Sequence, residues 1–488
     1  MKLAKPSLIL LLLLGSVVAH AAPGTQPPAS QASAVSPAES FKNGDTVCWV
    51  GDSITHGGSY HALIQLFYVT RFPDRDITYF NCGIGGDRAS GIMGKGVGFR
   101  FKYDILSHKP TVATIMLGMN DINRPLYKPE GGFDEKRMPR INEEKATSIT
   151  TYETNMKLLI EGLQAAGSRV ILIQPSIYDE TQVLPVNANI SVGANAALGI
   201  CAAKMKEWST HYNAGLVDFY SRMNAINAAQ QKKNPAFSVL GNPKNDRIHP
   251  GPPGHFVMAY AFLKDTGMTP WVAKMKVDGK SGAVIESTNC AISKTSASQG
   301  KVAFECLENS LPFPIPPDAL KALDLVPFMK ELNQEVLTVT NLAIGEWSLA
   351  IDGQACGEYS SQELATGVNL ASNEKTPQYQ QAAAILLEND NRMKLASMER
   401  NNVRLEHGYA IKLNDPAVDV TKIRAEIQKD MDAAATNPKT NVGDLKRILD
   451  TAARQAALAK EHEIAVSMRT AAKPKPHTYV LTPASGGK

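Results

Sequence analysis

The sequence lacks the residue spacings that usually bind a catalytic metal. None of the 10 histidines belongs to a His-x-x-x-His or His-Glu-x-x-His pattern, and the 6 cysteines include no Cys-x-x-Cys pair. Zinc sites in hydrolases are typically built from such ligands at these spacings. The sequence therefore argues against a metal-dependent reaction, and we expect no metal and no other cofactor.

An excess of positive charge is also absent. The 51 Lys and Arg residues are nearly balanced by 47 Asp and Glu, so the net charge is +4 over 488 residues, with both signs intermixed. A nucleic-acid-binding surface needs clustered basic residues. Beyond residues 1–21, no apolar run is long enough to span a bilayer. We expect neither a nucleic-acid partner nor stable insertion into a membrane.

The amino terminus has the features of a secretory signal peptide. Lys2 and Lys5 precede the apolar run Leu8–Leu14, and Ala19-His20-Ala21 offers a small-residue cleavage site. Residues 22–43 are largely rich in Pro, Ser, Ala and Gln, a composition that cannot bury a core. The sequence predicts a signal peptide over residues 1–21, a flexible linker over 22–43, and a periplasmic or secreted protein.

Cysteines in an exported chain permit disulfides without requiring them. Cys290 and Cys306 flank a predicted hairpin and are the pair that we expect to be bridged. Cys48 and Cys82 lie on predicted neighbouring strands, where two buried thiols are as compatible with the sequence as a bridge.

Strand and helix patterns alternate over residues 44–270. Apolar runs such as Thr46–Val50, Thr111–Leu117 and Arg169–Gln174 are each followed by a helical pattern. This rhythm predicts an α/β fold in which helices cover both faces of a doubly wound parallel sheet. Residues 124–145 interrupt the alternation as a charged insertion, either a wall of the substrate pocket or a mobile surface loop.

The alternation stops near residue 270. Short β-rich runs over residues 271–375 predict an antiparallel β unit, and amphipathic helical patterns fill residues 376–472 as a lid or an antiparallel hairpin. We expect residues 473–488 to be a flexible tail. Trp347 and Tyr359 of the β unit are expected in its core, the alternative being stacking on sugars.

Residues suited to acyl transfer follow the predicted strands. Ser53 follows the first strand, Gly86 lies in the glycine-containing loop after the second, and Asn120 follows the third, while Asp246 and His249 lie far downstream. In an open parallel sheet, the loops at the carboxyl ends of the strands form the ligand crevice. A serine becomes nucleophilic when an oriented base accepts its proton.

Ser53, Gly86, Asn120 and His249 occur in the order of the four sequence blocks of the SGNH (GDSL) hydrolase superfamily, which residues 44–270 resemble. The resemblance implies a flavodoxin-like three-layer fold. It also implies that Ser53 attacks an acyl carbonyl, His249 is the general base, and Asp246 orients it. The backbone N–H groups of Ser53 and Gly86 and the amide of Asn120 would form the oxyanion hole. Ser53 lacks the Gly-x-Ser-x-Gly surroundings of an α/β-hydrolase elbow.

Each of these motifs also has an ordinary structural interpretation. Gly-Asp-Ser is a common turn in which Ser caps a helix. Asp52, Asp87 and Asp121 are expected to be structural, as helix caps or loop ties. The glycine loop before Asp87 lacks the full G-x-G-x-x-G spacing, so it is not expected to bind phosphate. His56 lies close to Ser53 but is expected to line the pocket or face solvent.

The resulting hypothesis is an exported serine esterase that removes acetyl or other short acyl groups from carbohydrate, so we expect an acylated glycan or small molecule as its partner. One alternative is a lipase or phospholipase, although the sequence shows no basic amphipathic face for a lipid interface. The other is a glycan-binding protein with a catalytically silent esterase fold, against which the intact Ser53, Asn120, Asp246 and His249 argue.

Overall fold

The structure is a computed structural model, in which the predicted signal peptide and linker residues 22–37 lie outside the described residues. The linker prediction is wrong for residues 38–43. Phe41 is fully buried and its ring lies 5.7 Å from Trp49 and 5.6 Å from Phe262. Burial of one large aromatic side chain outweighs the disorder-prone composition around it. The described ranges are 38–94, 98–184, 190–241, 246–298, 300–415, 417–434 and 442–484.

A five-stranded parallel sheet organises the first region. Its strand order is β2-β1-β3-β4-β5, and all neighbours are parallel. This is the order of the flavodoxin-like doubly wound folds, so the predicted fold class is confirmed. The central strands are buried on both faces, as their near-continuous apolar runs require. The strands are β1 (Thr46–Gly51), β2 (Thr78–Gly83), β3 (Val112–Met116), β4 (Arg169–Ile173) and β5 (Gly215–Val217).

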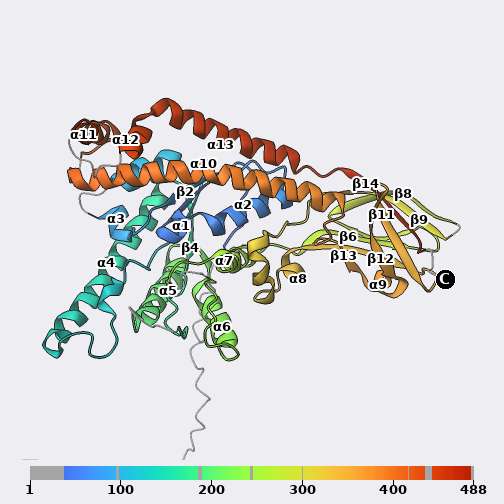
Figure 1. Cartoon of the computed structure of the whole chain (residues 1–488), viewed down its shortest axis with the longest axis horizontal. Coiled ribbons are helices and arrows are strands. Elements are labelled where there is room, and N and C mark those ends of the chain that lie inside the picture. The colour runs from blue at the N-terminus through green and yellow to red at the C-terminus, as the bar shows by residue number, and fades with distance from the viewer. Residues whose placement is uncertain are drawn as a thin grey trace, which may run out of the picture. The chain divides into compact units, whose positions relative to one another are not determined.

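Helices pack around this sheet (Figure 1). The predicted insertion at residues 124–145 is a loop only in its first part, because α4 begins at Met138. The helices are α1 (Ser53–His56), α2 (Ser59–Arg71), α3 (Ala89–Met93), α4 (Met138–Ala165), α5 (Ala194–His211), α6 (Tyr220–Gln231) and α7 (Pro252–Asp265), with a π-helical turn, η1, at Arg100–Ile105.

Two further sheets form a β-sandwich with its own apolar core. The first has the order β13-β10-β6-β7, and its β6–β10 pair is parallel, contrary to the all-antiparallel expectation. The second is antiparallel throughout, in the order β12-β11-β14-β9-β8. The strands are β6 (Trp271–Asp278), β7 (Val284–Thr288), β8 (Cys290–Ser298), β9 (Lys301–Glu308), β10 (Gln334–Thr340), β11 (Glu346–Ile351), β12 (Gln354–Ser360), β13 (Val368–Asn369) and β14 (Pro476–Pro483).

The prediction of a flexible tail over residues 473–488 is wrong for Pro476–Pro483, while residues 485–488 lie outside the described residues. Strand β14 lies between β9 and β11 in the second sheet, and Tyr479 and Leu481 are fully buried there. A single strand this far from its partners in sequence is stabilised by pairing and packing on both sides. Trp347 is buried in the same core and donates its indole N–H to the Ala343 carbonyl, so the core prediction for this side chain is confirmed. Tyr359 packs against the core as well.

The predicted Cys290–Cys306 disulfide is also wrong, because all six cysteines are free thiols in the structure. The register of β8 and β9 places Cys306 opposite Ile292 instead of opposite Cys290. Cys290 therefore lies diagonally across the strand pair from Cys306, and the two thiols hydrogen-bond to each other without being bridged. Cys48 and Cys82 are buried thiols on β1 and β2, the first of the two states that the sequence left open.

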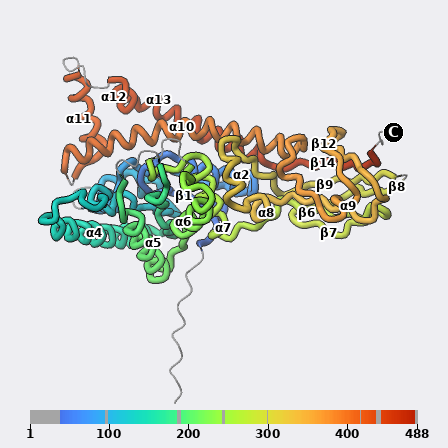
Figure 2. The backbone as a smooth tube through the Cα atoms, turned by 60° about the horizontal axis from the view of Figure 1, so that its bottom comes forward, coloured from blue at the N-terminus to red at the C-terminus, as the bar shows by residue number. Residues whose placement is uncertain are grey.

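The carboxy-terminal helices form an antiparallel hairpin, one of the two predicted arrangements. Helices α10 and α13 lie side by side (Figures 1 and 2). Arg392 of α10 pairs with Glu461 of α13, while Glu399 pairs with Arg454, so the two helices run in opposite directions. No helix in the described ranges is both long and apolar enough to cross a membrane. The helices are α8 (Phe328–Leu332), α9 (Ser361–Thr366), α10 (Pro377–Leu413), α11 (Val420–Ala433), α12 (Val442–Leu449) and α13 (Thr451–Ala471).

Two carboxyl groups lie inside the sandwich. Glu335 is fully buried, and Glu308 accepts hydrogen bonds from the Tyr479 hydroxyl at 2.9 Å and the Gln378 amide at 3.1 Å. Burial raises the pKa of Glu308 to about 7. Burial and the neighbouring Glu308 raise the pKa of Glu335 well above its ordinary value. Both groups are therefore neutral in the folded state at mildly acidic pH.

We expect the sandwich to lose stability as the pH rises. A carboxyl whose pKa is raised by folding contributes fully below its unfolded value, near 4.5, and that contribution is lost as the pH rises toward its folded value, which is about 7 for Glu308 and well above the ordinary value for Glu335. Glu335→Gln should therefore unfold at a higher urea concentration than the wild type at pH 8, and this gain should shrink at pH 5. The exposed Glu346 provides the control variant Glu346→Gln, which should change neither midpoint. If the urea midpoint of unfolding depends on pH equally in the wild type and in Glu335→Gln, the prediction is contradicted.

Candidate active site

Ser53 lies at the carboxyl edge of the parallel sheet, directly after β1. The apolar strand ends at Gly51, and Asp52 caps α1 by accepting a hydrogen bond from the Ile54 N–H at 3.0 Å. Ser53 is the first residue of that helix. A Cβ atom at Gly51 would lie 2.2 Å from the Thr55 hydroxyl oxygen, so only glycine fits where the strand turns into the helix. The local sequence therefore places the Ser53 hydroxyl at the top of the sheet.

The structure brings Ser53, His249 and Asp246 into one hydrogen-bonded chain. Ser53 Oγ lies 2.8 Å from His249 Nε2, and His249 Nδ1 lies 2.6 Å from Asp246 Oδ2. This is the geometry in which a carboxylate holds an imidazole in the tautomer that accepts the serine proton. Although they are 196 positions apart in the sequence, Ser53 and His249 are in direct contact.

The Asp246 carboxylate is held in its charged form. Burial alone raises its pKa, but the His249 backbone N–H, the His249 ring and the Ile248 N–H outweigh burial, and the net pKa lies below the ordinary value. The two backbone N–H groups donate to Asp246 Oδ1 at 2.9 and 3.0 Å. The Asp-x-x-His spacing thus folds into a turn in which the acid orients both the backbone and the ring of its partner.

A buried arginine that the sequence analysis did not identify anchors this turn. Arg247 has a positive φ of 63° and is 4% exposed. Its Nη1 donates to the carbonyls of Asp179 at 2.7 Å and Gln182 at 3.0 Å, and its own carbonyl accepts from the Asp179 N–H. Arg247 thereby fastens the loop between Asp246 and His249 to the segment that follows β4. The sequence shows an arginine between Asp246 and His249, but it does not show that Asp179 and Gln182 are its partners.

The predicted oxyanion donors lie on the loops next to Ser53. After β2, a Cβ atom built at Gly85 would lie 4.0 Å from the Ser53 Cβ, and Gly86 has a positive φ of 83°. Asn120 follows β3, and its side-chain amide donates to the Asp87 carbonyl at 3.0 Å, one residue beyond Gly86. An Asn amide has two N–H donors, so a second remains for a substrate oxygen.

The three aspartates that flank these residues are structural, as their sequence context predicts. Asp121 accepts from the Ala89 N–H at 2.8 Å and the Gly118 N–H at 3.0 Å, which ties the Asn120 loop to the loop after β2. Burial raises the pKa of Asp121 to about 7 and that of Asp52 to about 7. Asp87 accepts from the Arg100 guanidinium at 3.1 and 2.8 Å.

Helix α10 forms a wall of the site, so the predicted hairpin also covers the site as the alternative prediction of a lid required. His56 on α1 contacts Asn401 of α10, with 3.2 Å between the His56 ring Nε2 and the Asn401 Oδ1. One hollow opens beside the His249 turn and α1 and is closed by α10; its lining includes Gly57, Gly58, Pro250, His255, Asp318, Asn389, Asp390 and Met393. A second hollow lies on the other side of the glycine loop, lined by Gly85, Gly86, Arg88, His407 and Ile411 among others. None of residues 124–145 lines either hollow.

One group of side chains in the described ranges has metal-ligand spacing: Cys82, Asp104 and His108. Asp104, however, already forms ion pairs with the guanidinium groups of Arg100 and Arg400. Two fixed positive charges on the only carboxylate of the group oppose the entry of a cation. We assign no metal to this cluster.

The first half of the chain is similar to known acylhydrolases. Residues 49–256 match the model of the GDSL-like lipase/acylhydrolase family. An acetylxylan esterase of Geobacillus stearothermophilus is 23% identical over 245 residues, covering 47% of this chain and 97% of that protein. A solved structure of an acetylxylan esterase from the same organism covers 46% of this chain and 96% of its own, with 21% identity and a TM-score of 0.35.

A second kind of relative matches far more of the chain. The solved structure of a gut microbial diltiazem-metabolizing enzyme is 29% identical, covers 92% of this chain and 100% of its own, and has a TM-score of 0.80. The likeness therefore extends beyond the parallel sheet into the β-sandwich and the helical hairpin, and this combination of parts is not peculiar to the present chain.

Proposed function

We propose that the chain is an exported serine esterase of the GDSL-like lipase/acylhydrolase family, and that it removes acetyl or other short acyl groups from carbohydrate. The observation that carries the serine mechanism is the Ser53–His249–Asp246 chain, with contacts of 2.8 and 2.6 Å. The proposal of export rests on the charged and apolar segments of residues 1–21.

The proposed reaction has two halves. His249 Nε2 accepts the Ser53 proton as Oγ bonds to the acyl carbon, and Asp246 stabilises the imidazolium that forms. The carbonyl oxygen takes up the electron pair and is held by N–H groups of Ser53 and Gly86 and by the Asn120 amide. Collapse breaks the ester bond as His249 protonates the leaving alkoxide. Water then attacks the acyl carbon as His249 takes its proton. The bond from the acyl carbon to Ser53 Oγ breaks, the carboxylic acid leaves, and His249 returns the proton to Ser53.

Two observations support an acetylated glycan as the substrate. The sequence relative from Geobacillus stearothermophilus is named an acetylxylan esterase and aligns over nearly its whole length. The hollow beside His249 is open to solvent and lined by polar groups such as Asn389, Asp390 and Asp318 together with apolar ones, which suits a hydroxyl-rich alcohol part.

A second candidate substrate is a small drug-sized ester. The relative that matches nearly the whole chain is named a diltiazem-metabolizing enzyme. Its likeness covers 92% of this chain, including the helical hairpin, and α10 of that hairpin contributes side chains to the lining of both hollows. If this helix selects the substrate, turnover should be faster on compact esters than on polymers.

Acetate release decides between these substrates. We expect the mature protein to release acetate from acetylated xylo-oligosaccharides faster than from acetylated small drugs at equal acetyl concentration, and Ser53→Ala to release none from either. A reversed ranking would favour the small-ester function. If the folded protein releases acetate from neither kind of substrate, the proposal that it removes short acyl groups is contradicted.

A further inference from the structure

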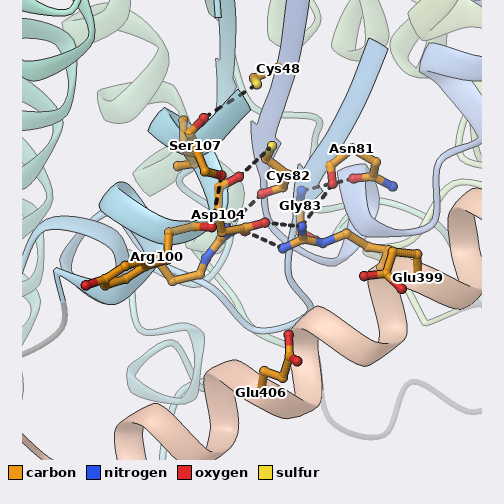
Figure 3. Close-up of polar contacts among 12 residues, drawn as sticks. Cys48, Asn81, Cys82, Gly83, Arg100, Asp104, Ser107, Glu399 and Glu406 are labelled. Atoms are coloured by element: carbon orange, nitrogen blue, oxygen red, sulfur yellow. Dashed lines mark hydrogen bonds and ion pairs between the residues drawn. The ribbon is translucent and has the colours of Figure 1, made fainter. Parts of the chain in front are cut away.

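Helix α10 inserts one arginine into the edge of the hydrolase sheet. Arg400 is 4% exposed, although it lies more than 300 positions after the strand that it contacts. Its Nε donates to the Gly83 carbonyl at 2.6 Å and its Nη1 to the Asn81 carbonyl at 3.0 Å. Figure 3 shows Asn81 and Gly83 next to the ribbon of α10, the helix that carries Glu399.

Within the described ranges, no strand pairs with these carbonyls on the outer side of β2. Strand β2 is an edge of the parallel sheet. The Ile84 N–H donates inward to the Gly51 carbonyl of β1, so the Gly83 carbonyl, on the other side of the same peptide bond, points outward. Arg400 takes the place of a neighbouring strand for Asn81 and Gly83, which end β2 just before the glycine loop. It thereby fixes where that loop begins.

A buried charge network continues from Arg400 to the loop itself. Two Arg400 nitrogens bind the two oxygens of Asp104, each at 2.7 Å, and Asp104 also pairs with Arg100. Arg100 in turn binds Asp87 and donates to the Cys82 carbonyl at 2.8 Å. The positive and negative charges alternate, so each buried group is compensated.

The network ends at the predicted oxyanion donors. Asp87 directly follows Gly86, and its carbonyl accepts the hydrogen bond from the Asn120 amide. Arg400 therefore holds the start of the loop through Gly83, and it holds the end of the loop through Asp104, Arg100 and Asp87. Its helical neighbour Asn401 contacts His56 of the helix that begins at Ser53.

We propose that Arg400 is a positioning residue for the oxyanion hole, so that the carboxy-terminal helical hairpin is part of the catalytic apparatus. The inference rests on the proposed Ser53 esterase. Oxyanion donors act only when they are aimed at the place where charge develops, and a displacement of about 1 Å costs about a hundredfold in rate. Arg400 touches no reacting atom and acts through the Gly83–Asp87 loop.

The test is Arg400→Lys, which keeps the charge and most of the length. A lysine ammonium is a single point donor and cannot bind two carbonyls and both oxygens of Asp104 together. We expect kcat on a short-chain chromogenic ester to fall about ten- to a hundredfold, in line with misaimed oxyanion donors, while KM changes less than about threefold. The melting temperature of each variant is measured in parallel.

Arg392→Lys is the matched control. Arg392 lies on the same helix, is 5% exposed, and is bound by Gln65 and Glu461, away from the glycine loop. The Arg392→Lys variant should lose about as much stability as Arg400→Lys, but it should keep the wild-type kcat per folded molecule. If both variants lose kcat equally, or if neither does, Arg400 has no positioning role.

A double-mutant cycle separates positioning from general damage. Because Arg400 is proposed to act through the oxyanion hole, Arg400→Lys combined with Asn120→Ala should lose less than the product of the two single losses. Multiplying losses would overturn the inference. If Arg400→Lys does not fold, Asp104→Asn tests the same network with the same cycle. Wild-type turnover that survives Ser53→Ala would instead contradict the proposed function, whatever Arg400 does.

Discussion

Ser53→Ala is expected to remove nearly all esterase turnover, with kcat lowered by about 10⁴-fold or more. The variant keeps the fold, because Ser53 makes its only side-chain hydrogen bond described here to His249. His249→Ala should lose a similar amount, since without it the hydroxyl has no proton acceptor. The measurement is kcat and KM on a short-chain chromogenic ester, with the melting temperature as the test of folding.

The double variant is the sharper measurement. Groups that act as one unit lose their effect together, so Ser53→Ala combined with His249→Ala should be little worse than either alone. Losses that multiply would show that the two residues act independently and that the contact in the structure is not catalytic. His211→Ala, which changes an exposed histidine at the end of α5, should keep wild-type kcat.

Asp246→Asn should lower kcat less than loss of the nucleophile does. The amide cannot accept from the backbone N–H groups and the ring of His249 as the carboxylate does, but the serine and its base remain in place. The placement of the acid was predictable, because the Asp-x-x-His spacing is local and folds into a single turn.

The parallel sheet could be predicted because its signal is also local. Apolar runs such as Thr46–Val50 and Thr111–Leu117 alternate with helical patterns, and the structure has β1 and β3 there. Once the strands are parallel, the residues that follow them must gather at one edge. That step placed Ser53 and Asn120 on the same side of the molecule without knowledge of any tertiary contact.

The parts that the sequence did not reveal depend on partners that are distant in the chain. Nothing near Phe41 shows that an aromatic pocket receives it, and nothing near residues 476–483 shows that β9 and β11 leave a place between them. Arg400 resembles any charged residue of an amphipathic helix until its partners Gly83 and Asp104 are known. A charged side chain can be buried only where a partner compensates its charge, and here that partner lies far away in the sequence.

The same distinction separates the aspartates from the cysteines. Asp121 was assigned a structural role because an aspartate in a loop next to a strand commonly accepts backbone N–H groups, and its partners Gly118 and Ala89 are such groups. The Cys290–Cys306 bridge required more than a pairing of two strands. The strands bring the two thiols into hydrogen-bond contact, yet both stay free, and a hairpin pattern predicts the pairing without predicting the bond.

Asn120→Ala should cost rate rather than binding. The Asn120 amide lies against the Asp87 carbonyl, on the loop that passes Ser53, and its second N–H remains for an oxyanion. Such a donor strengthens as the carbonyl oxygen becomes charged, so its loss raises the barrier by about 3–4 kcal/mol, a hundred- to a thousandfold in kcat, with little change in KM. A raised KM at unchanged kcat would show that Asn120 only binds the ground state.

Asp121→Asn supplies the contrast one residue away. The Asp121 carboxyl accepts two backbone N–H bonds that join the loops after β2 and β3, and an amide can accept only one of them. We expect a lower melting temperature but a kcat per folded molecule within about fivefold of wild type, because no donor to the oxyanion is removed. The substitution at Asn120 should therefore lower kcat, whereas the substitution at Asp121 should lower the melting temperature. A large loss of kcat in Asp121→Asn with an unchanged melting temperature would show that Asp121 takes part in catalysis.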